Sequence, residues 1–364
     1  MKALVVGGTG PTGPHIVRGL LARGYEVTIF HRGIHEPPDL PDVEHIHADP
    51  HFAETIADGL GQRSWDLAIV TYGRLLLLAE ALAGRCDRFI SVGGIPTHIG
   101  VLSPDKLRPF GMRIPTREND DLAIEQGGPD APMIRFAHRT WRSEQRVLAL
   151  HAQNAFAGTH FRYPRIYGPN QPDSSDWSIV KRVLDRRPYM ILPDGGLQID
   201  ARADARNAAH CLLLGVDRPD VAAGQIYNCV EDEQFTWRQL LELVVDQLGG
   251  VTEMLSMPDA IAYPARVLTP MATASGHWLL DGSKARAQLG YRDIVPPRQA
   301  FSQQVAWLAA NPPARCDRDP FDYAAEDRLI ALWQDALGRV LREADFPLPD
   351  ATHNYDHPTV PARN

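Results

Sequence analysis

The sequence predicts an α/β protein in which a doubly wound parallel sheet is followed by a smaller C-terminal lobe. Short apolar runs alternate with helix-like stretches through the first half of the chain, which is typical of a parallel sheet covered by helices on both faces. A glycine-rich turn follows the first apolar run, and the pattern becomes irregular after roughly residue 170. These observations together predict the fold class.

Each expected strand is a short apolar run, and each expected helix shows helical spacing or recognisable end signals. The helix at 236–248, for example, starts at Phe235-Thr236 and stops at Gly249-Gly250. We expect strands at 3–6, 27–30, 67–70, 89–92, 159–163 and 225–230, and helices at 18–23, 136–153, 178–184, 203–214, 236–248 and 324–343.

A chain of 364 residues is longer than one hydrophobic core usually requires. We therefore expect three parts. Residues 1–170 form the sheet domain, residues 171–315 form the smaller lobe and return segments to the sheet, and residues 316–364 form a helix and a polar tail.

Charge and composition exclude several classes of protein. The formal net charge of -8 argues against a nucleic-acid partner, and the longest apolar run, 75–82, is far too short to cross a membrane. The first strand begins at once, so we expect no signal peptide. The cysteines at 86, 211, 229 and 316 lack metal or disulfide spacing, and we expect a cytoplasmic protein with free thiols.

The glycine-rich turn predicts a dinucleotide site. Gly7, Gly10 and Gly13 are spaced three apart, directly after a strand and before a helix. Small residues let the chain turn tightly, let a diphosphate approach the backbone and let the helix pack close to the sheet. The helix also presents free amides and the positive end of its dipole. We therefore expect a Rossmann-type sheet that binds a dinucleotide.

The end of the second strand indicates which dinucleotide binds. An NAD site usually places an acid there to bind the ribose hydroxyls. This chain has His31-Arg32, and no acid follows until Glu36. Because arginine pairs with a 2′-phosphate and stacks on adenine, we expect NADP(H). The alternative is that Arg32 only solvates a loop.

Further segments of the chain carry a family resemblance: 162–169 (Arg-Tyr-Pro-Arg-Ile-Tyr-Gly-Pro), Asp204 before a small-residue helix, 224–228, 281–285 and 289–291. With the glycine turn, they resemble the extended short-chain dehydrogenase/reductase family, which includes nucleotide-sugar epimerases and dehydratases. The resemblance spans roughly residues 1–310. It implies a C-terminal lobe that binds a small-molecule substrate, and a homodimer paired through sheet-flanking helices. It implies these cofactor contacts: Gly7, Thr9, Gly10, Pro11, Thr12, Gly13, His31, Arg32, Asp49, Thr71, Tyr72 and Pro164.

The usual catalytic groups of that family are missing. In the family a helix carries Tyr-x-x-x-Lys and then a glutamate, and the spacing from Glu144 to Arg162 fits this register without a gap. That register places Phe136 at the tyrosine position and Thr140 at the lysine position. Phenylalanine has no proton to donate, and threonine carries no charge that lowers a neighbour's pKa. A coding bias towards arginine explains few lysines, but it does not explain the missing tyrosine.

Two further positions depart from the family. Gly93 and Gly94 replace the paired serines that follow the fourth parallel strand of the family's sheet. Leu197 stands where relatives that bind nucleotide sugars often have an arginine, and Arg165 replaces an asparagine. A nucleotide sugar therefore becomes a less favoured substrate than a small anionic or apolar molecule.

Three residues are candidates for the remaining chemistry. His98 replaces the tyrosine just beyond the serine pair and titrates near neutrality; the alternative is a loop histidine bonded to backbone. Tyr72 follows a strand and carries a phenolic donor; the alternative is a ring packed on the cofactor. Arg165 offers a clamp for a carboxylate; the alternative is a structural ion pair.

The histidines of the segment 45–51 raise the question of a metal site. His45 and His47 share one face of the expected third strand. The segment falls in the adenine loop of the expected fold, however, and the sequence shows no fixed ligand geometry. We therefore expect no metal.

Two functions from different classes remain. The chain is either an NADP(H)-dependent oxidoreductase or epimerase-like enzyme of atypical mechanism, or a non-catalytic NADP(H)-binding redox sensor or scaffold. The motifs of the substrate lobe favour the enzyme, although a fold does not fix a function.

Overall fold

The computed structural model describes residues 1–123, 132–171, 175–262, 268–269, 276–314, 316 and 319–344. The chain divides into two compact units, Met1–Phe321 and Asp322–Asn364. In the second unit the described residues form one helix, α13 (Tyr323–Ala344). The predicted tail after residue 344 lies outside the described residues.

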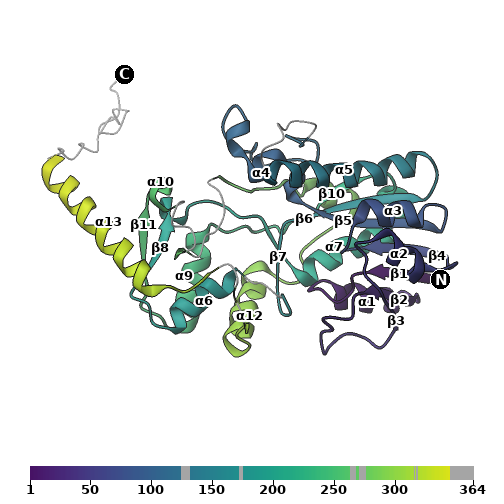
Figure 1. Cartoon of the computed structure of the whole chain (residues 1–364), viewed down its shortest axis with the longest axis horizontal. Coiled ribbons are helices and arrows are strands. Elements are labelled where there is room, and N and C mark those ends of the chain that lie inside the picture. Colours follow the sequence, from purple (N-terminus) through teal and green to yellow (C-terminus); the bar gives the residue numbers. More distant parts are fainter. Residues whose placement is uncertain are drawn as a thin grey trace, which may run out of the picture. The chain divides into compact units, whose positions relative to one another are not determined.

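A parallel sheet with its covering helices forms one side of the larger unit, at the right in Figure 1. Within the described residues it has seven strands in the order β10-β6-β5-β4-β1-β2-β3, and every pairing is parallel. The order places β1 between β4 and β2, so the loop after β1 opens where the strand order changes direction. The bounds are β1 (Lys2–Val6), β2 (Glu26–His31), β3 (Glu44–His47), β4 (Trp65–Val70), β5 (Cys86–Gly94), β6 (Ala157–Tyr163) and β10 (Ile226–Asn228).

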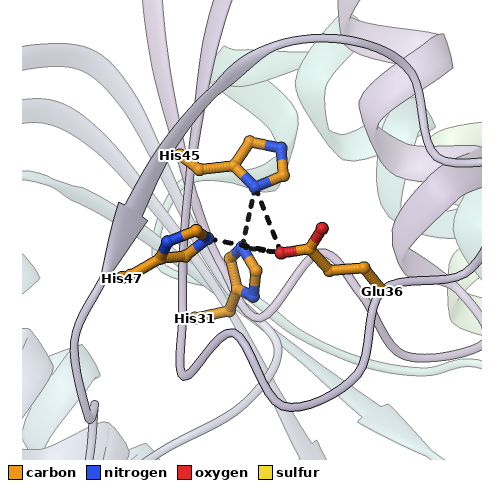
Figure 2. A group of neighbouring side chains, drawn as sticks. All are labelled: His31, Glu36, His45 and His47. Atoms are coloured by element: carbon orange, nitrogen blue, oxygen red, sulfur yellow. Dashed lines mark hydrogen bonds and ion pairs between the residues drawn. The ribbon is translucent and has the colours of Figure 1, made fainter.

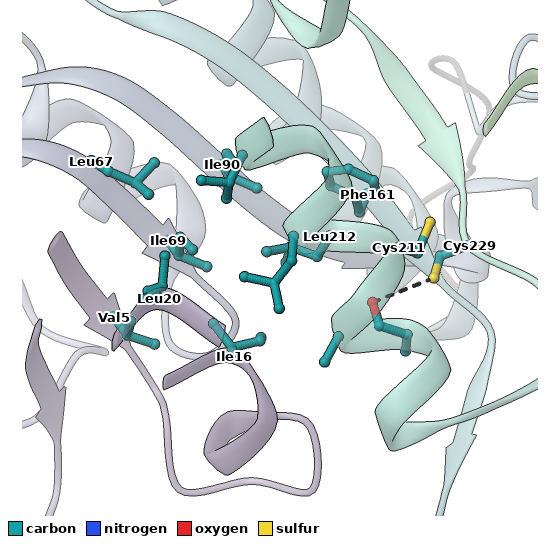
Figure 3. Packing of buried hydrophobic residues seen from close by; sticks show 14 of the residues in the cluster. Val5, Ile16, Leu20, Leu67, Ile69, Ile90, Phe161, Cys211, Leu212 and Cys229 are labelled. Carbon is teal, nitrogen blue, oxygen red and sulfur yellow. Dashed lines mark hydrogen bonds between the residues drawn. The ribbon is translucent and has the colours of Figure 1, made fainter. Parts of the chain in front are cut away.

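Alternating side chains of the central strands enter two separate cores. In β1, Ala3 and Val5 pack into one core, and Leu4 and Val6 pack into the other. Both faces of the strand are therefore buried, which explains its unbroken apolar run. Figure 3 shows Val5 with side chains from neighbouring strands and helices in the first core.

Helices cover both faces of the sheet. α1 and α7 contact each other over the first core, and α3 and α5 contact each other over the second. The helices with the most bearing on the site are α1 (Gly13–Ala22), α2 (Ala53–Leu60), α3 (Leu75–Leu82), α4 (Ile99–Leu102), α5 (Pro132–Ala152) and α7 (Ala205–Asp217). α8 (Pro219–Ala222) and α11 (Ser283–Leu289) lie beside α7.

Several segments after residue 163 build the smaller lobe around a third core, while β10, α7, α8 and α11 return to the sheet. Two parallel strand pairs, β8–β11 and β7–β9, contribute to it. α9 (Trp237–Leu248) starts at a capping box between Thr236 and Gln239 and ends at Gly249, at φ +67°, as its end signals predict. The other bounds are β7 (Arg165–Tyr167), β8 (Tyr189–Pro193), β9 (Arg202–Asp204), β11 (Glu253–Met257), α6 (Asp176–Leu184), α10 (Asp259–Ala262) and α12 (Pro297–Ala310).

The predicted fold class is confirmed, with differences in detail. Each expected strand and helix is present within a few residues. The start of α1 was expected too late: the helix begins at Gly13 rather than residue 18, because its first turn contains glycine and proline and shows no apolar helical spacing. Among the described residues, the elements that were not expected include the helices α2, α3, α4, α8, α10, α11 and α12 and the short strands β7, β8, β9 and β11. The predicted boundary at residue 170 falls inside the larger unit, so it stays a prediction. Among the described helices, none is both long and apolar enough to span a membrane.

Neighbouring leucines of α1 provide a test of the first core. Leu20 is fully buried in it, whereas Leu21 is 40% exposed. Leu20→Ala is expected to lower the free energy of unfolding by about 2–5 kcal/mol through lost burial and a cavity, and Leu21→Ala by roughly 0.5 kcal/mol or less. Urea denaturation measures both, and equal losses would contradict the described packing.

Candidate functional site

The turn between β1 and α1 is built around its glycines. Gly7 has φ +104°, and its amide donates to the Phe30 carbonyl at 2.9 Å. A Cβ atom on Gly13 would overlap the Gly8 carbonyl, so α1 starts against the turn itself. A Cβ atom on Gly10 would meet nothing within 4 Å. The turn is therefore closed towards the protein and open at Gly10.

A cavity of about 380 Å³ lies against this open side. Segments from the ends of β1, β2, β4 and β6 form its walls, so it sits at the carboxyl edge of the sheet, where α/β proteins bind ligands. It is lined by Gly7, Thr9, Gly10, Pro11, Thr12, His31, Arg32, Gly33, Ile34, His35, Thr71, Tyr72, Tyr163 and Ile166.

Most of the predicted cofactor contacts line this cavity, and Gly13, Asp49 and Pro164 do not. Gly13 packs against Gly8. The Asp49 carboxylate accepts hydrogen bonds from the His51 backbone amide at 3.0 Å and ring Nδ1 at 2.7 Å. Pro164 is buried, and its neighbours in the chain reach the cavity instead. Binding by each predicted residue stays a prediction.

Sequence analysis missed five residues of the wall. Gly33, Ile34 and His35 continue the loop after Arg32, and Tyr163 and Ile166 flank Pro164. The alternation of side chains along β6 was a usable signal for Tyr163. The loop after β2 has no periodic sequence pattern, so the sequence did not indicate that its residues line the cavity.

The wall at the end of β2 is basic and aromatic. The Arg32 guanidinium carbon lies 5.5 Å from the centre of the Tyr72 ring. Tyr72 is 42% exposed and meets the His51 ring edge-on. Among the described residues, no carboxylate lines the cavity. Glu36, the first acid after β2, instead lies within 3.6 Å of the ring nitrogens of His31, His45 and His47.

A buried charge network surrounds Arg162 of β6, next in the chain to the cavity residue Tyr163. Arg162 of β6 is fully buried, and it donates from Nη2 and Nε to the two Glu144 carboxylate oxygens at 2.7 and 3.0 Å. Its Nη1 donates to the Glu118 carbonyl and lies 3.3 Å from Nε2 of His98. Although burial alone would raise the pKa of Glu144, the Arg162 guanidinium holds it below its usual range.

His98 belongs to this network and is fully buried. Its Nδ1 lies 2.6 Å from the Asp120 carbonyl, which can only accept, so Nδ1 carries the proton and Nε2 accepts from Arg162. Burial and the Arg162 charge lower the pKa of His98 to about 4. The structure thus places His98 as the alternative interpretation describes it, as a loop histidine hydrogen-bonded to the backbone. His98 does not line the described cavity.

The structure also describes the positions at which the family resemblance predicts that the usual catalytic groups are missing. Phe136 on α5 is 46% exposed, and the Thr140 hydroxyl donates to the Phe136 carbonyl at 3.1 Å, within the helix. A Cβ atom on Gly93 would lie 2.6 Å from Nε2 of His160. A serine therefore does not fit at Gly93 unless the buried His160 ring moves.

Arg165 is held in an ion pair rather than presented to the cavity. Its Nε donates to Asp200 at 2.5 Å, and its guanidinium lies near the rings of Trp237 and Trp278. This matches the structural alternative for Arg165. The pairing with Asp200 neutralises the charge that a substrate carboxylate would need.

Comparisons with known proteins agree with the fold. No family model matches the chain. A dTDP-glucose 4,6-dehydratase of an Actinoplanes species is 25% identical over 361 residues, covering 85% of this chain and 98% of its own. A 3-diazoavenalumate denitrifying reductase of a Streptomyces species is 26% identical over 311 residues, covering 81% of this chain and 97% of its own.

Solved structures show the same architecture. The crystal structure of a dTDP-glucose 4,6-dehydratase from Bacillus anthracis, in complex with NAD, superposes with a TM-score of 0.64 at 14% identity. The superposition covers 85% of this chain and 97% of that chain. The chain therefore has the Rossmann-like α/β fold of these proteins.

The network around His98 predicts a pH dependence of stability. Between about pH 6.5, the usual pKa of histidine, and pH 4, the unfolded chain binds a proton at His98 that the folded chain does not. The free energy of unfolding therefore falls as the pH is lowered through this window. His98→Gln keeps one donor and one acceptor, and we expect it to make that slope shallower by up to about 1.4 kcal/mol per pH unit.

Urea denaturation at several pH values measures this slope. His35→Gln, at an exposed loop position, is the matched control. An identical slope for the wild type and His98→Gln would contradict the described protonation state of His98.

Proposed function

We propose that the chain is an NADP(H)-dependent oxidoreductase or epimerase-like enzyme of atypical mechanism, acting on a small molecule that is not a nucleotide sugar. The observation that carries this proposal is the cavity at the carboxyl edge of the sheet. A glycine turn lines one side of it, and Arg32 lines the other, with no carboxylate among its described lining residues.

The residues present fit a dinucleotide. Gly10 faces open space, so a diphosphate can approach the backbone there. α1 begins three residues later, at Gly13, and presents the positive end of its dipole to the same space. The Gly13 amide donates to the Gly10 carbonyl and Pro14 has no amide hydrogen, so the helix contributes mainly its dipole. Thr9 and Thr12 add hydroxyls to the lining. The cavity therefore offers neutral donors to the diphosphate and a cation further along its wall.

The cation favours a 2′-phosphate over a free ribose hydroxyl. An acid at the end of β2 would accept from the ribose hydroxyls of NAD, but the nearby acids are engaged elsewhere. Glu36 lies among three imidazoles, and Asp49 accepts from His51. Arg32 is exposed above the Tyr72 ring, which leaves its guanidinium available to a phosphate.

The chemistry of the site rests on positioning. When bound, a reduced nicotinamide supplies a hydride, and hydride transfer needs close placement of donor and acceptor more than an acid or base on the protein. Tyr72 is the cavity tyrosine with an exposed side chain, because Tyr163 is buried with its hydroxyl 3.3 Å from the Ala208 carbonyl. We assign proton donation to Tyr72; packing of its ring on the cofactor is the alternative.

The substrate side supports a small molecule. Leu197, at the position where relatives often have an arginine, is 60% exposed and offers no phosphate contact. Arg165 is neutralised by Asp200. The similarity to a reductase of 3-diazoavenalumate supports reduction of a small molecule. The similarity to a dTDP-glucose dehydratase leaves dehydration or epimerisation as further reactions of this type.

A non-catalytic NADP(H) sensor or scaffold is the second candidate. The observation that favours it is the absence of a free acid or base at the usual positions, where Phe136 is exposed and the Thr140 hydroxyl is bonded within α5. Such a protein would bind the cofactor tightly and turn over no substrate.

Cofactor preference is tested by titrating the protein with NADPH and NADH. We expect NADPH to bind more tightly, and Arg32→Ala to weaken NADPH at least about tenfold through loss of a charge-assisted hydrogen bond, with NADH little changed. Arg74→Ala, an exposed arginine outside the cavity lining, is the control. Equal affinities of the wild type for both cofactors would overturn the preference.

Activity is tested by following NADPH oxidation with a panel of aldehydes, ketones and enones. We expect at least one class to be reduced. Tyr72→Phe is expected to lower kcat by about a hundredfold while leaving the Kd for NADPH unchanged. Unchanged turnover would remove the Tyr72 hydroxyl from the mechanism, and complete inactivity of the wild type with tight NADPH binding would favour the sensor.

A further inference from the structure

Histidines 31, 45 and 47 converge with Glu36 at the edge of the sheet (Figure 2). The four potential ligand atoms all lie within 4.8 Å of one another. His31 is buried, His45 is half-buried, and His47 and Glu36 are exposed. The cluster is thus anchored in the sheet and open to solvent on one side.

The sheet register explains this convergence. His31 at the end of β2 pairs directly with His47 of β3, so the two side chains stand on the same face of the sheet. His45, two residues before His47, shares that face because side chains in a strand alternate. Glu36 arrives from the loop that follows β2. Three positions are therefore fixed by backbone pairing, and the fourth comes from a loop.

The spacing matches a tetrahedral ion. Zinc–nitrogen and zinc–oxygen bonds of about 2.0–2.1 Å place neighbouring ligand atoms of a tetrahedron roughly 3.3–3.4 Å apart. Here His31 Nε2 lies 3.1 Å from His45 Nδ1. Glu36 Oε1 lies 3.6, 3.5 and 3.3 Å from the ring nitrogens of His31, His45 and His47. These separations need only small side-chain adjustments around a central ion.

The chemistry of the donors selects a cation of intermediate hardness. Three imidazoles and one carboxylate suit Zn²⁺ and similar transition metals, whereas Ca²⁺ and Mg²⁺ prefer oxygen ligands alone. An anion such as a phosphate would meet the Glu36 carboxylate at the centre of the group. Exposed ion pairs contribute little to stability, so fold stability alone gives little reason for four such groups to converge.

We propose that His31, Glu36, His45 and His47 bind one Zn²⁺ ion. The expectation of no metal rested on the absence of a fixed geometry in the sequence, and the pairing of β2 with β3 supplies that geometry. Four protein ligands fill a tetrahedral shell, so the site is structural rather than catalytic. The proposal stands independently of the proposed enzymatic function.

His31 is the ligand that must rearrange. The Gly33 amide donates to His31 Nδ1 at 3.2 Å, so the ring proton sits on Nε2, the atom that faces the cluster. Zinc binding at Nε2 moves this proton to Nδ1, and the Gly33 amide must turn away. Gly33 has φ +70° and lacks a side chain that would resist the turn.

The bound ion would link β2, β3 and the loop between His31 and Glu36. Arg32, Gly33, Ile34 and His35 lie in that loop and line the cavity. Zinc would therefore hold the edge strand to the sheet and restrict the wall that carries Arg32. Removal of the ion should loosen this wall without unfolding the rest of the sheet.

The test uses untagged full-length protein treated with EDTA and desalted. Isothermal titration with ZnCl₂ is expected to show one ion per chain, and Co²⁺ in the same site should give the intense visible absorption of tetrahedral coordination. His45→Gln, His47→Gln and Glu36→Gln should each weaken Zn²⁺ binding by about tenfold or more. His35→Gln, a histidine of the same loop outside the cluster, is the matched control.

The outcomes are distinct. Loss of affinity in the three ligand variants, with the control unchanged, supports the site. Absence of Zn²⁺ binding, equal binding by wild type and ligand variants, or binding of inorganic pyrophosphate in place of Zn²⁺ would overturn it. Glu36→Gln keeps the test valid should a histidine variant fail to fold, because Glu36 is exposed on a loop. None of these readouts requires NADP(H) or a substrate, so failure here leaves the proposed function untouched.

Discussion

The buried pair between Arg162 and Glu144 is the interaction on which the arrangement around the cavity depends. A fully buried guanidinium is costly unless each of its donors finds an acceptor. Each nitrogen of the Arg162 guanidinium has at least one acceptor, supplied by the Glu144 carboxylate, the Glu118 carbonyl and Nε2 of His98. These partners come from α5 and from the segment after β5, so one side chain of β6 fixes both. Removing a single partner of such a pair typically costs about 3–5 kcal/mol.

This pair also establishes how α5 is positioned against the sheet. The sequence register that aligned Glu144 with Arg162 was only a count of residues, and the structure shows the two side chains in bidentate contact. α5 is therefore held against the sheet at this point. Phe136 and Thr140 stand on that helix, so the lack of an acid or base at these two positions comes from their side chains and not from a displaced helix. On β5 the same conclusion holds for Gly93, because His160 occupies the space that a Cβ atom would need.

The sequence predicted the features that depend on local patterns. The central strands are apolar on both faces, and the capping signals around α9 mark its ends. The short strands β7, β8, β9 and β11 were not predicted, because three to five residues carry too little periodicity to separate a strand from a loop. The protonation state of His98 was likewise unreadable, because it depends on Arg162, 64 residues away in the chain.

The histidine cluster depends on strand register and loop path, which the sequence alone does not specify. His45 and His47 share a strand face in any β-strand, but the contribution of His31 depends on the register between β2 and β3. A shift of one residue in that register would turn His31 to the other face. Glu36 is placed by a loop whose path no periodic pattern specifies. The sequence therefore contained two of the four groups as a recognisable pair.

Two consecutive residues at the end of β2 belong to two neighbouring features, the histidine cluster and the cavity wall. His31 belongs to the histidine cluster, and Arg32, the next residue, extends over Tyr72 in the cavity wall. Because Glu36 is drawn towards the imidazoles, no carboxylate is left among the described lining residues to oppose a phosphate near Arg32. The cluster therefore affects the charge of the cavity wall whether or not an ion is bound, because it holds the Glu36 carboxylate away from the residues that line the cavity near Arg32.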